Sequence, residues 1–116
     1  MDLRNNQVRR AVETALKIHQ QDTKEKGGDI LCFLPSGEDV DQAIRMAEEQ
    51  VDNDNTLDHK EVVFLPLYAS LPYNMQARVF QPRDVRRTGR RVIFATNLAE
   101  TSVTGKFAFS VVVALV

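Results

Sequence analysis

The sequence predicts an α/β fold, in which a parallel sheet carries helices on both faces. Three segments of strand length support this prediction: residues 29–34, 62–67 and 91–95, each a continuous apolar run apart from Asp29 and Arg91 at the start of the first and the third. Runs without polar alternation are typical of strands buried on both faces, as in parallel sheets. Stretches with helical periodicity alternate with these runs, which favours helices packed on the two faces of one sheet.

The first helix is expected over residues 7–20, because apolar side chains recur there at helical spacing (Val8, Val12, Ala15, Leu16, with His19 in the same series). Gly27 and Gly28 turn the chain toward the first strand. A second helix begins near Glu38, and its inward positions are Val40, Ala43, Ile44 and Ala47. Ser36 is its expected N-cap, with Asp39 as capping-box partner.

A third, short helix is expected after Pro72, with Met75 and Val79 as its inward pair. Residues 52–60 are polar and without period, so they predict an exposed loop. The pattern further indicates a short helical turn over residues 99–102 and a last strand over 107–116.

Composition indicates one small domain, since 116 residues suffice for a single core and the hydrophobic share is 43%. The net charge of −1 excludes a polycation, so any nucleic-acid binding must come from a local patch. No secretory signal opens the chain, and the longest apolar run is too short to span a membrane. Cys32 lies within an apolar run, which predicts a buried thiol in an intracellular, reducing compartment.

Small polar residues follow each of the three expected strands. These strand exits are Pro35-Ser36-Gly37, Tyr68-Ala69-Ser70 and Thr96-Asn97. Ligands of open α/β sheets bind outside the carboxyl ends of the strands, where hydroxyls, amides and glycine allow close approach to the backbone. The exits therefore indicate a binding edge.

The same three exits resemble motifs of DEAH-box RNA helicases. Residues 30–40 are similar to motif IV, residues 65–82 to the motif that follows it, and residues 92–104 to motif V. Together the matches cover roughly residues 8–104, in the family's order. The resemblance implies a second RecA-like domain, a three-layer fold of the P-loop NTPase type, here truncated at its carboxyl end.

The resemblance also implies roles for particular residues. The RNA sugar-phosphate backbone would be contacted by Ser36, Gly37, Thr96 and Asn97, with Ser70 and Thr101 as secondary contacts, while Ser102 and Thr104 would face the nucleotide. Hydroxyls, amides and helix N-termini suit contacts with the backbone of a nucleic acid rather than with its bases. The alternative is structural: Ser36 only caps its helix, and Thr96-Asn97 only make a turn.

Several parts of a helicase motor are not found in this sequence. Around Gly105-Lys106 the P-loop pattern fails, because Glu100 stands at the leading glycine position and Phe107 at the serine or threonine position. An Asp-Glu-Ala-His run is also missing. No catalytic residue is therefore assigned, and ATP and Mg²⁺ are expected only in the complete helicase, together with its first RecA-like domain. Residues 105–116 depart from the family pattern, although residues 1–116 as a whole are expected to form part of this domain.

An arginine cluster precedes the third strand, at Arg83, Arg86, Arg87, Arg90 and Arg91. It has two interpretations. Arg86, Arg87 and Arg90 would bind an RNA backbone or a protein partner, or the cluster is a solvated loop. His19 and His59 have no matching ligands nearby, so no metal site is expected.

Three classes of function follow. The first is a helicase domain that grips RNA, for which the family implies a nuclear location, roles such as pre-mRNA splicing, and protein cofactors or a ribonucleoprotein complex as partners. The second is a non-catalytic protein-interaction module that keeps the fold without the chemistry. An independent small enzyme has little support, because the sequence contains no evident nucleophile–base pair or metal-ligand cluster.

Overall fold

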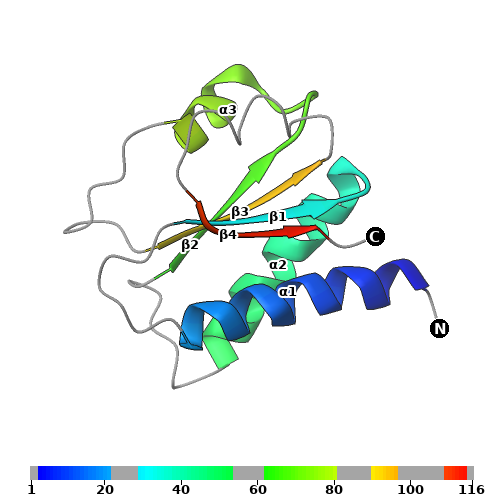
Figure 1. Ribbon diagram of the computed structural model, residues 1–116. Helices are drawn as coiled ribbons and strands as arrows, with labels where there is room; N and C mark the ends of the chain where they lie inside the picture. Colours follow the sequence, from blue (N-terminus) through cyan, green and yellow to red (C-terminus); the bar gives the residue numbers. More distant parts are fainter. Residues whose placement is uncertain (1–2, 22–28, 54–61, 81–89, 97–108, 115–116) are drawn as a thin grey trace.

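The computed structural model describes residues 3–21, 29–53, 62–80, 90–96 and 109–114. The elements are α1 (Leu3–Gln21), β1 (Asp29–Leu34), α2 (Gly37–Asn53), β2 (Val62–Leu67), α3 (Tyr73–Phe80), β3 (Arg90–Thr96) and β4 (Phe109–Ala114). Helices and strands alternate along the chain, and the predicted α/β fold is confirmed (Figure 1).

The four strands form one parallel sheet in the order β2-β3-β1-β4. In this sheet β3 lies between β1 and β2, with Leu34 paired to Thr96 and Leu67 paired to Ala95. The last strand, which the sequence predicts over residues 107–116, pairs with β1 along its other side. The carboxyl ends of β1, β3 and β2 consequently meet at one edge.

Helices cover both faces of the sheet, α1 and α2 on one and α3 on the other (Figure 1). Crossovers between parallel strands are right-handed, and the chain moves from β1 past β3 to β2 and then back to β3. Because these two steps run in opposite directions, α2 and α3 must lie on opposite faces.

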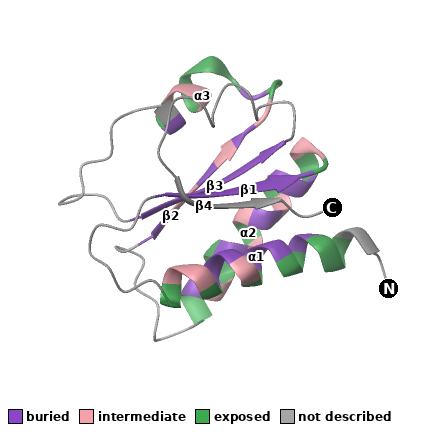
Figure 2. Cartoon of the chain, viewed as in Figure 1, coloured by how far each residue is buried: buried purple, intermediate pink, exposed green. Residues whose placement is uncertain are grey.

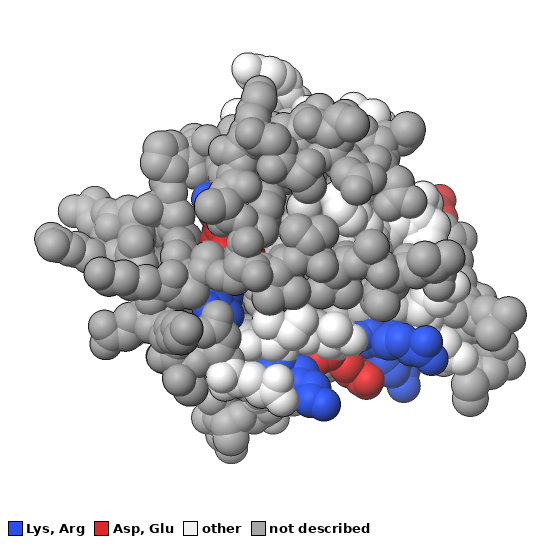
Figure 3. Space-filling model, viewed as in Figure 1, with Lys and Arg blue, Asp and Glu red and all other residues white. Residues whose placement is uncertain are grey.

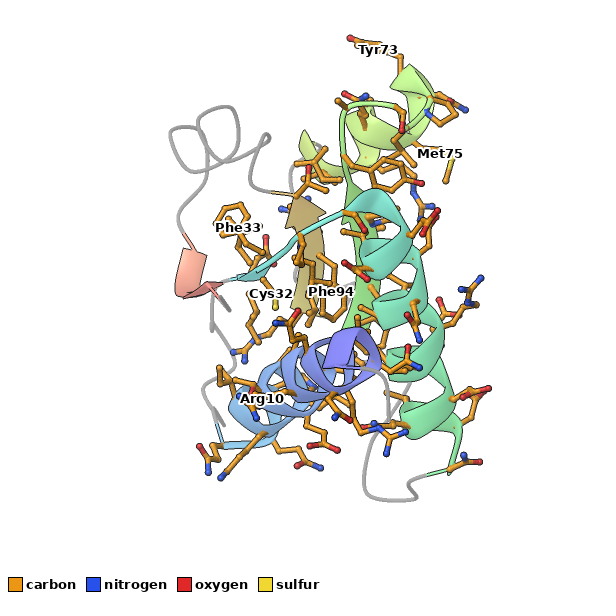
Figure 4. The ribbon with its side chains drawn as sticks, turned by 90° about the vertical axis from the view of Figure 1, so that its right-hand side faces the viewer. Arg10, Cys32, Phe33, Tyr73, Met75 and Phe94 are labelled. Atoms are coloured by element: carbon orange, nitrogen blue, oxygen red, sulfur yellow. The ribbon has the colours of Figure 1, made fainter. Side chains whose placement is uncertain are left out.

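The side chains of each strand divide between the two faces. Ile30, Cys32 and Leu34 pack with α1 and α2, whereas Leu31 and Phe33 pack on the α3 side. Figure 4 shows Cys32 and Phe94 pointing toward the two long helices, with Phe33 directed away from them. Phe64 and Phe94 stack with ring centroids 6.4 Å apart. Every residue of β1 and β3 is buried (Figure 2). The apolar runs predict this for the apolar positions, but not for Arg90 and Arg91 at the start of β3.

The predicted helical stripes are confirmed except at one position. Val8, Val12, Ala15 and Leu16 are buried, as are Val40, Ala43 and Ala47, and Ile44 is partly buried against the same core. In α3, Val79 is fully buried, but the prediction that Met75 is its inward partner is wrong, because Met75 is 37% exposed. With only eight residues, α3 offers the sheet a narrow face, and Val79 near its end lies on that face while Met75 lies outside it. The turn predicted over 99–102 lies outside the described residues.

A buried ion pair joins the amino ends of β1 and β3. The Asp29 carboxylate accepts hydrogen bonds from the backbone N–H of Arg91 at 3.1 Å and from its Nε at 3.0 Å, and Nη2 lies 2.8 Å from Oδ2. Nη1 of Arg91 donates to the carbonyl oxygen of Val79 at 3.1 Å. One guanidinium thus connects two strands to the last turn of α3. Arg91 is therefore a structural residue, and neither interpretation of the arginine cluster applies to it.

Removing the guanidinium should be costly. Arg91→Met leaves the buried Asp29 carboxylate without its charged partner, and we expect a loss of about 3–5 kcal/mol in the free energy of unfolding, measured in urea. Arg10→Met, at an exposed site on α1, should change stability by no more than about 0.5 kcal/mol. The double variant Asp29→Leu with Arg91→Met should recover much of the loss, and a double variant no more stable than Arg91→Met would contradict this account.

Cys32 lies in the core on the α1–α2 side of β1, as the sequence predicts. Burial raises the pKa of its thiol from 9.0 to about 12. Burial disfavours the thiolate, which is the reactive form of cysteine, so this thiol is a packing group rather than a nucleophile.

The raised pKa predicts a specific pH dependence. The folded state holds the Cys32 proton more tightly than the unfolded chain, so its contribution to stability is complete below pH 9.0 and is lost as the pH rises toward about 12. Urea unfolding across this window should therefore show a steeper loss of stability for the wild type than for Cys32→Ala, by up to about 1.4 kcal/mol per pH unit. Parallel pH profiles for the two proteins would rule this contribution out.

Candidate nucleic-acid interface at the carboxyl edge of the sheet

The three strand exits lie next to one another at the carboxyl edge. Thr96, the last residue of β3, is paired with Leu34 at the end of β1. On the other side of β3, Ala95 is paired with Leu67, so Tyr68 follows directly beside Thr96. The order β2-β3-β1 therefore places Thr96 between the turn at Ser36 and the turn at Ser70.

The turn after β1 is held by a helix cap. The Ser36 hydroxyl accepts the backbone N–H of Asp39 at 3.3 Å and donates to Asp39 Oδ2 at 3.0 Å. The Ser36 carbonyl accepts the N–H of Val40 at 3.1 Å. The predicted N-cap is thus confirmed. Since the hydroxyl proton already serves Asp39, Ser36 could donate to a ligand only by giving up that bond.

Gly37, the first residue of α2, lies under the ring of Tyr68. A Cβ at this position would be 3.2 Å from Cδ2 and 3.3 Å from Cγ of the tyrosine. That is closer than carbon atoms normally approach, so glycine allows this contact. The Tyr68 hydroxyl donates hydrogen bonds to the Asp41 carboxylate, to Oδ1 at 3.1 Å and to Oδ2 at 3.2 Å.

The turn after β2 is shaped by Gln76 of α3. Its Nε2 donates to the carbonyl oxygens of Leu71 at 2.7 Å and Ala69 at 3.3 Å. Within the turn, the N–H of Leu71 donates to the Tyr68 carbonyl at 3.1 Å. These bonds leave Ser70 exposed at the edge while Leu71 is buried beneath it.

Thr96 differs from the other predicted contacts. It is buried, and among the described residues its Oγ1 has no hydrogen-bond partner. A buried hydroxyl without a partner costs about 1–3 kcal/mol. Asn97, Thr101, Ser102, Thr104, Arg86 and Arg87 lie outside the described residues.

Arg90 is not at this edge. It is the first residue of β3 and is buried, six residues before Thr96 and thus about 20 Å from it along the strand. Arg90 therefore does not join Ser36, Gly37, Ser70 and Thr96 in one site, and its burial corrects the prediction of an exposed cation at this position.

Charge around the edge is acidic on the α2 side. Glu38 and Asp39 lie in the first turn of α2, and Asp41 follows in the next. The described basic residues of α1 lie elsewhere: Arg9, Arg10 and Lys17 are exposed together with Glu13, a mixed surface over α1 in Figure 3. A mixed surface of this kind is typical of a solvated helix face.

A groove of about 380 Å³ lies along β2, lined by Glu48, Asp52 and Arg78 with apolar residues of α2 and β2 (Val51, Val62, Val63 and Phe64). It contains none of the predicted contact residues. In the described ranges no group of three or more His, Cys, Asp or Glu could hold a metal ion, and no helix is long and apolar enough to cross a membrane.

Comparison with known proteins decides the family. The chain is 43% identical over 98 residues to "Probable ATP-dependent RNA helicase DHX35" of Pongo abelii and 42% identical over 98 residues to the protein of the same name in Homo sapiens, matches that cover 84% of the chain. It is also 43% identical over 83 residues to "Probable ATP-dependent RNA helicase DHR2" of Saccharomyces cerevisiae, a match covering 69% of the chain. The chain belongs to the DEAH-box helicase family.

This DEAH-box chain spans 11–13% of the length of these relatives. No family model matches it. Its four parallel strands with helices on both faces are consistent with part of a RecA-like domain.

Two residues that organise the edge of this DEAH-box chain were missed by the sequence analysis. Tyr68 and Asp41 are 27 positions apart, so no local pattern connects them. The signal available in the sequence was a tyrosine directly after a buried strand, among small residues. A large side chain in that place predicts packing across the edge, but its partner could not be known without the strand order.

Loss of the helix cap at Ser36 should measurably lower the stability of the protein. Ser36→Ala removes the oxygen that accepts the Asp39 N–H, and we expect the free energy of unfolding in urea to fall by about 1 kcal/mol. Ser36→Asn, which can also cap, should restore most of it. Ser70→Ala removes an exposed hydroxyl at the neighbouring exit and serves as the control, with a change within about 0.5 kcal/mol. Equal effects at Ser36 and Ser70 would show that the cap contributes nothing.

Proposed function

We propose that this chain is the second RecA-like domain of a DEAH-box RNA helicase and that it contacts the RNA backbone through the carboxyl edge of its sheet. The relatives are RNA helicases by name, and the chain matches them over most of its own length. The adjacent exits at Ser36, Ser70 and Thr96 offer small polar groups over the ends of three neighbouring strands. Such groups suit contacts that hold a nucleic acid without reading its bases.

Thr96 carries this proposal. Its hydroxyl is buried at the edge without a partner among the described residues, and a ribose or phosphate oxygen arriving there would supply one. A hydroxyl that is unsatisfied in the free protein and bonded in the complex favours binding, because the new bond removes the cost of burying the hydroxyl without a partner. Asn97 follows directly in the chain and is proposed to share this contact.

Ser36 and Gly37 are proposed to contact ribose hydroxyls rather than phosphates. Glu38, Asp39 and Asp41 surround the start of α2 with negative charge, which opposes a phosphate there. A ribose 2′-hydroxyl can instead donate to an oxygen of this turn. That group also distinguishes RNA from DNA.

ATP and Mg²⁺ are proposed to bind in the complete helicase together with its first RecA-like domain, where hydrolysis would be coupled to RNA unwinding or remodelling in the nucleus. Ser102 and Thr104 are proposed to face that nucleotide.

A protein-interaction module is the second candidate, and one observation favours it. Tyr73 is 85% exposed and Met75 37% exposed on α3, where both point away from the body of the protein (Figure 4). Aromatic and methionine side chains are enriched at protein interfaces. If this candidate is correct, Tyr73→Ser abolishes capture of a protein partner and leaves RNA affinity unchanged.

The role of Thr96 predicts opposite effects on binding and stability. Thr96→Val keeps the shape and removes the hydroxyl, so the free energy of unfolding should rise by about 1 kcal/mol. Affinity for a single-stranded oligouridylate, measured by fluorescence anisotropy at fixed salt, should fall about fivefold.

Thr14→Val, the same substitution on α1, is the matched control and should leave RNA affinity unchanged. A wild-type chain that shows no salt-dependent binding to RNA would overturn the proposed function. A Thr96→Val variant with unchanged affinity would overturn the role of this hydroxyl alone.

A further inference from the structure

Tyr68 makes two separate contacts with the first turn of α2. Its ring lies against Gly37, where a Cβ would be 3.2 Å from Cδ2, and its hydroxyl bonds both carboxylate oxygens of Asp41 at 3.1 and 3.2 Å. Gly37 and Asp41 are four residues apart, so they lie on the same face of the helix, one turn from each other. One side chain therefore spans the turn from which Ser36 and Gly37 are presented.

This contact joins elements that are not neighbours in the sheet. Tyr68 follows β2, whereas α2 follows β1, and β3 lies between these two strands. Thr96 ends that middle strand. The distance from the Ser36–Gly37 turn to Thr96 is thus fixed from both sides, by the pairing of β1 with β3 and by the tyrosine contact from β2.

The backbone of Tyr68 is held by hydrogen bonds, as its hydroxyl is. Its carbonyl accepts the N–H of Leu71 at 3.1 Å, and Gln76 donates to the carbonyl oxygens of Ala69 and Leu71 in the same turn. Burial, followed by the hydrogen bond to Asp41 and the charge of Asp41, raises the pKa of Tyr68. A phenol with the ordinary pKa of 10.0 is already protonated at neutral pH, and the raised pKa of Tyr68 keeps it a hydrogen-bond donor there.

We infer that Tyr68 is a positioning residue for RNA: by holding Gly37 and Asp41 it fixes the turn of Ser36 and Gly37 relative to Thr96, so that one RNA backbone can contact both exits. The inference rests on the proposed function, since RNA is the ligand that both exits would share. It assigns Tyr68 no contact with RNA itself.

The experiment compares two tyrosines, because the chain contains only Tyr68 and Tyr73. Tyr68→Phe keeps the ring over Gly37 and removes the hydroxyl, and we expect about fivefold weaker binding of a single-stranded oligouridylate, the loss of one ordinary hydrogen bond. Tyr73→Phe makes the same change at a side chain that is 85% exposed and should bind like the wild type. The full 116-residue chain is used throughout.

Nuclear magnetic resonance supplies a readout that does not depend on RNA. The backbone amide of Gly37 in the ¹⁵N spectrum should shift in Tyr68→Phe and stay in place in Tyr73→Phe. Asp41 gives the rescue test, since Asp41→Asn retains an acceptor for the phenol and Asp41→Ala does not. Affinity should therefore be closer to the wild type in Asp41→Asn than in Asp41→Ala.

The outcomes separate this inference from the proposed function. If the wild-type chain does not bind RNA, both the inference and the proposed function are wrong. If the wild type binds RNA and Tyr68→Phe binds it with the same affinity, only the positioning role is wrong, whether or not the Gly37 amide signal shifts. Weaker binding in Tyr68→Phe together with a shifted Gly37 amide supports it, and weaker binding with an unmoved amide overturns it, because the tyrosine would then act on RNA without moving the turn.

Discussion

The complete burial of β1 and β3 constrains the rest of this fold. Both strands lie between other strands and present apolar side chains to both faces, so each face needs its own layer of helix. Right-handed crossovers then place α2 on one face and α3 on the other. Both helices must start at the carboxyl edge, because each begins where a strand ends. The turns at Ser36 and Ser70 therefore lie at the same edge of the sheet because two of its strands are buried on both faces.

The polar side chains at the two ends of β3 differ in their hydrogen bonding. At the amino end, Arg91 is matched by Asp29 and the Val79 carbonyl, and this arrangement closes the base of the sheet. At the carboxyl end, the Thr96 hydroxyl is buried without a described partner. A buried polar group without a hydrogen-bond partner lowers the free energy of unfolding by on the order of 1–3 kcal/mol or more. That is a noticeable part of the stability of a small domain. The polar side chain at the amino end therefore contributes to stability, whereas the hydroxyl at the carboxyl end has no described partner, and this difference is the reason for proposing a ligand there.

The strands, the buried helix positions and the Ser36–Asp39 cap could be predicted because each depends on residues close in sequence. Five apolar residues in a row, Ile30 to Leu34, identify β1, and a serine three positions before an aspartate identifies the cap. The remaining features depend on pairs brought together by the strand order. Arg91 looked like one more arginine of a basic loop, yet its partner Asp29 lies 62 positions away. Met75 has the spacing of an inward residue, but a short helix anchored through Val79 leaves it outside.

Knowledge of the packing also changes what each candidate contact can do. From sequence, Ser36 and Gly37 looked equivalent to Thr96, as small residues at strand exits. In the folded protein the Ser36 proton serves Asp39, and Gly37 carries the ring of Tyr68. Both therefore have a structural role that accounts for their identity without a ligand, whereas the Thr96 hydroxyl has no such partner among the described residues. The acidic start of α2 adds a second difference, because phosphate is disfavoured there and ribose is not. An RNA strand on this edge would accordingly lie with its sugars toward α2 and with Thr96 as its firmest point of contact.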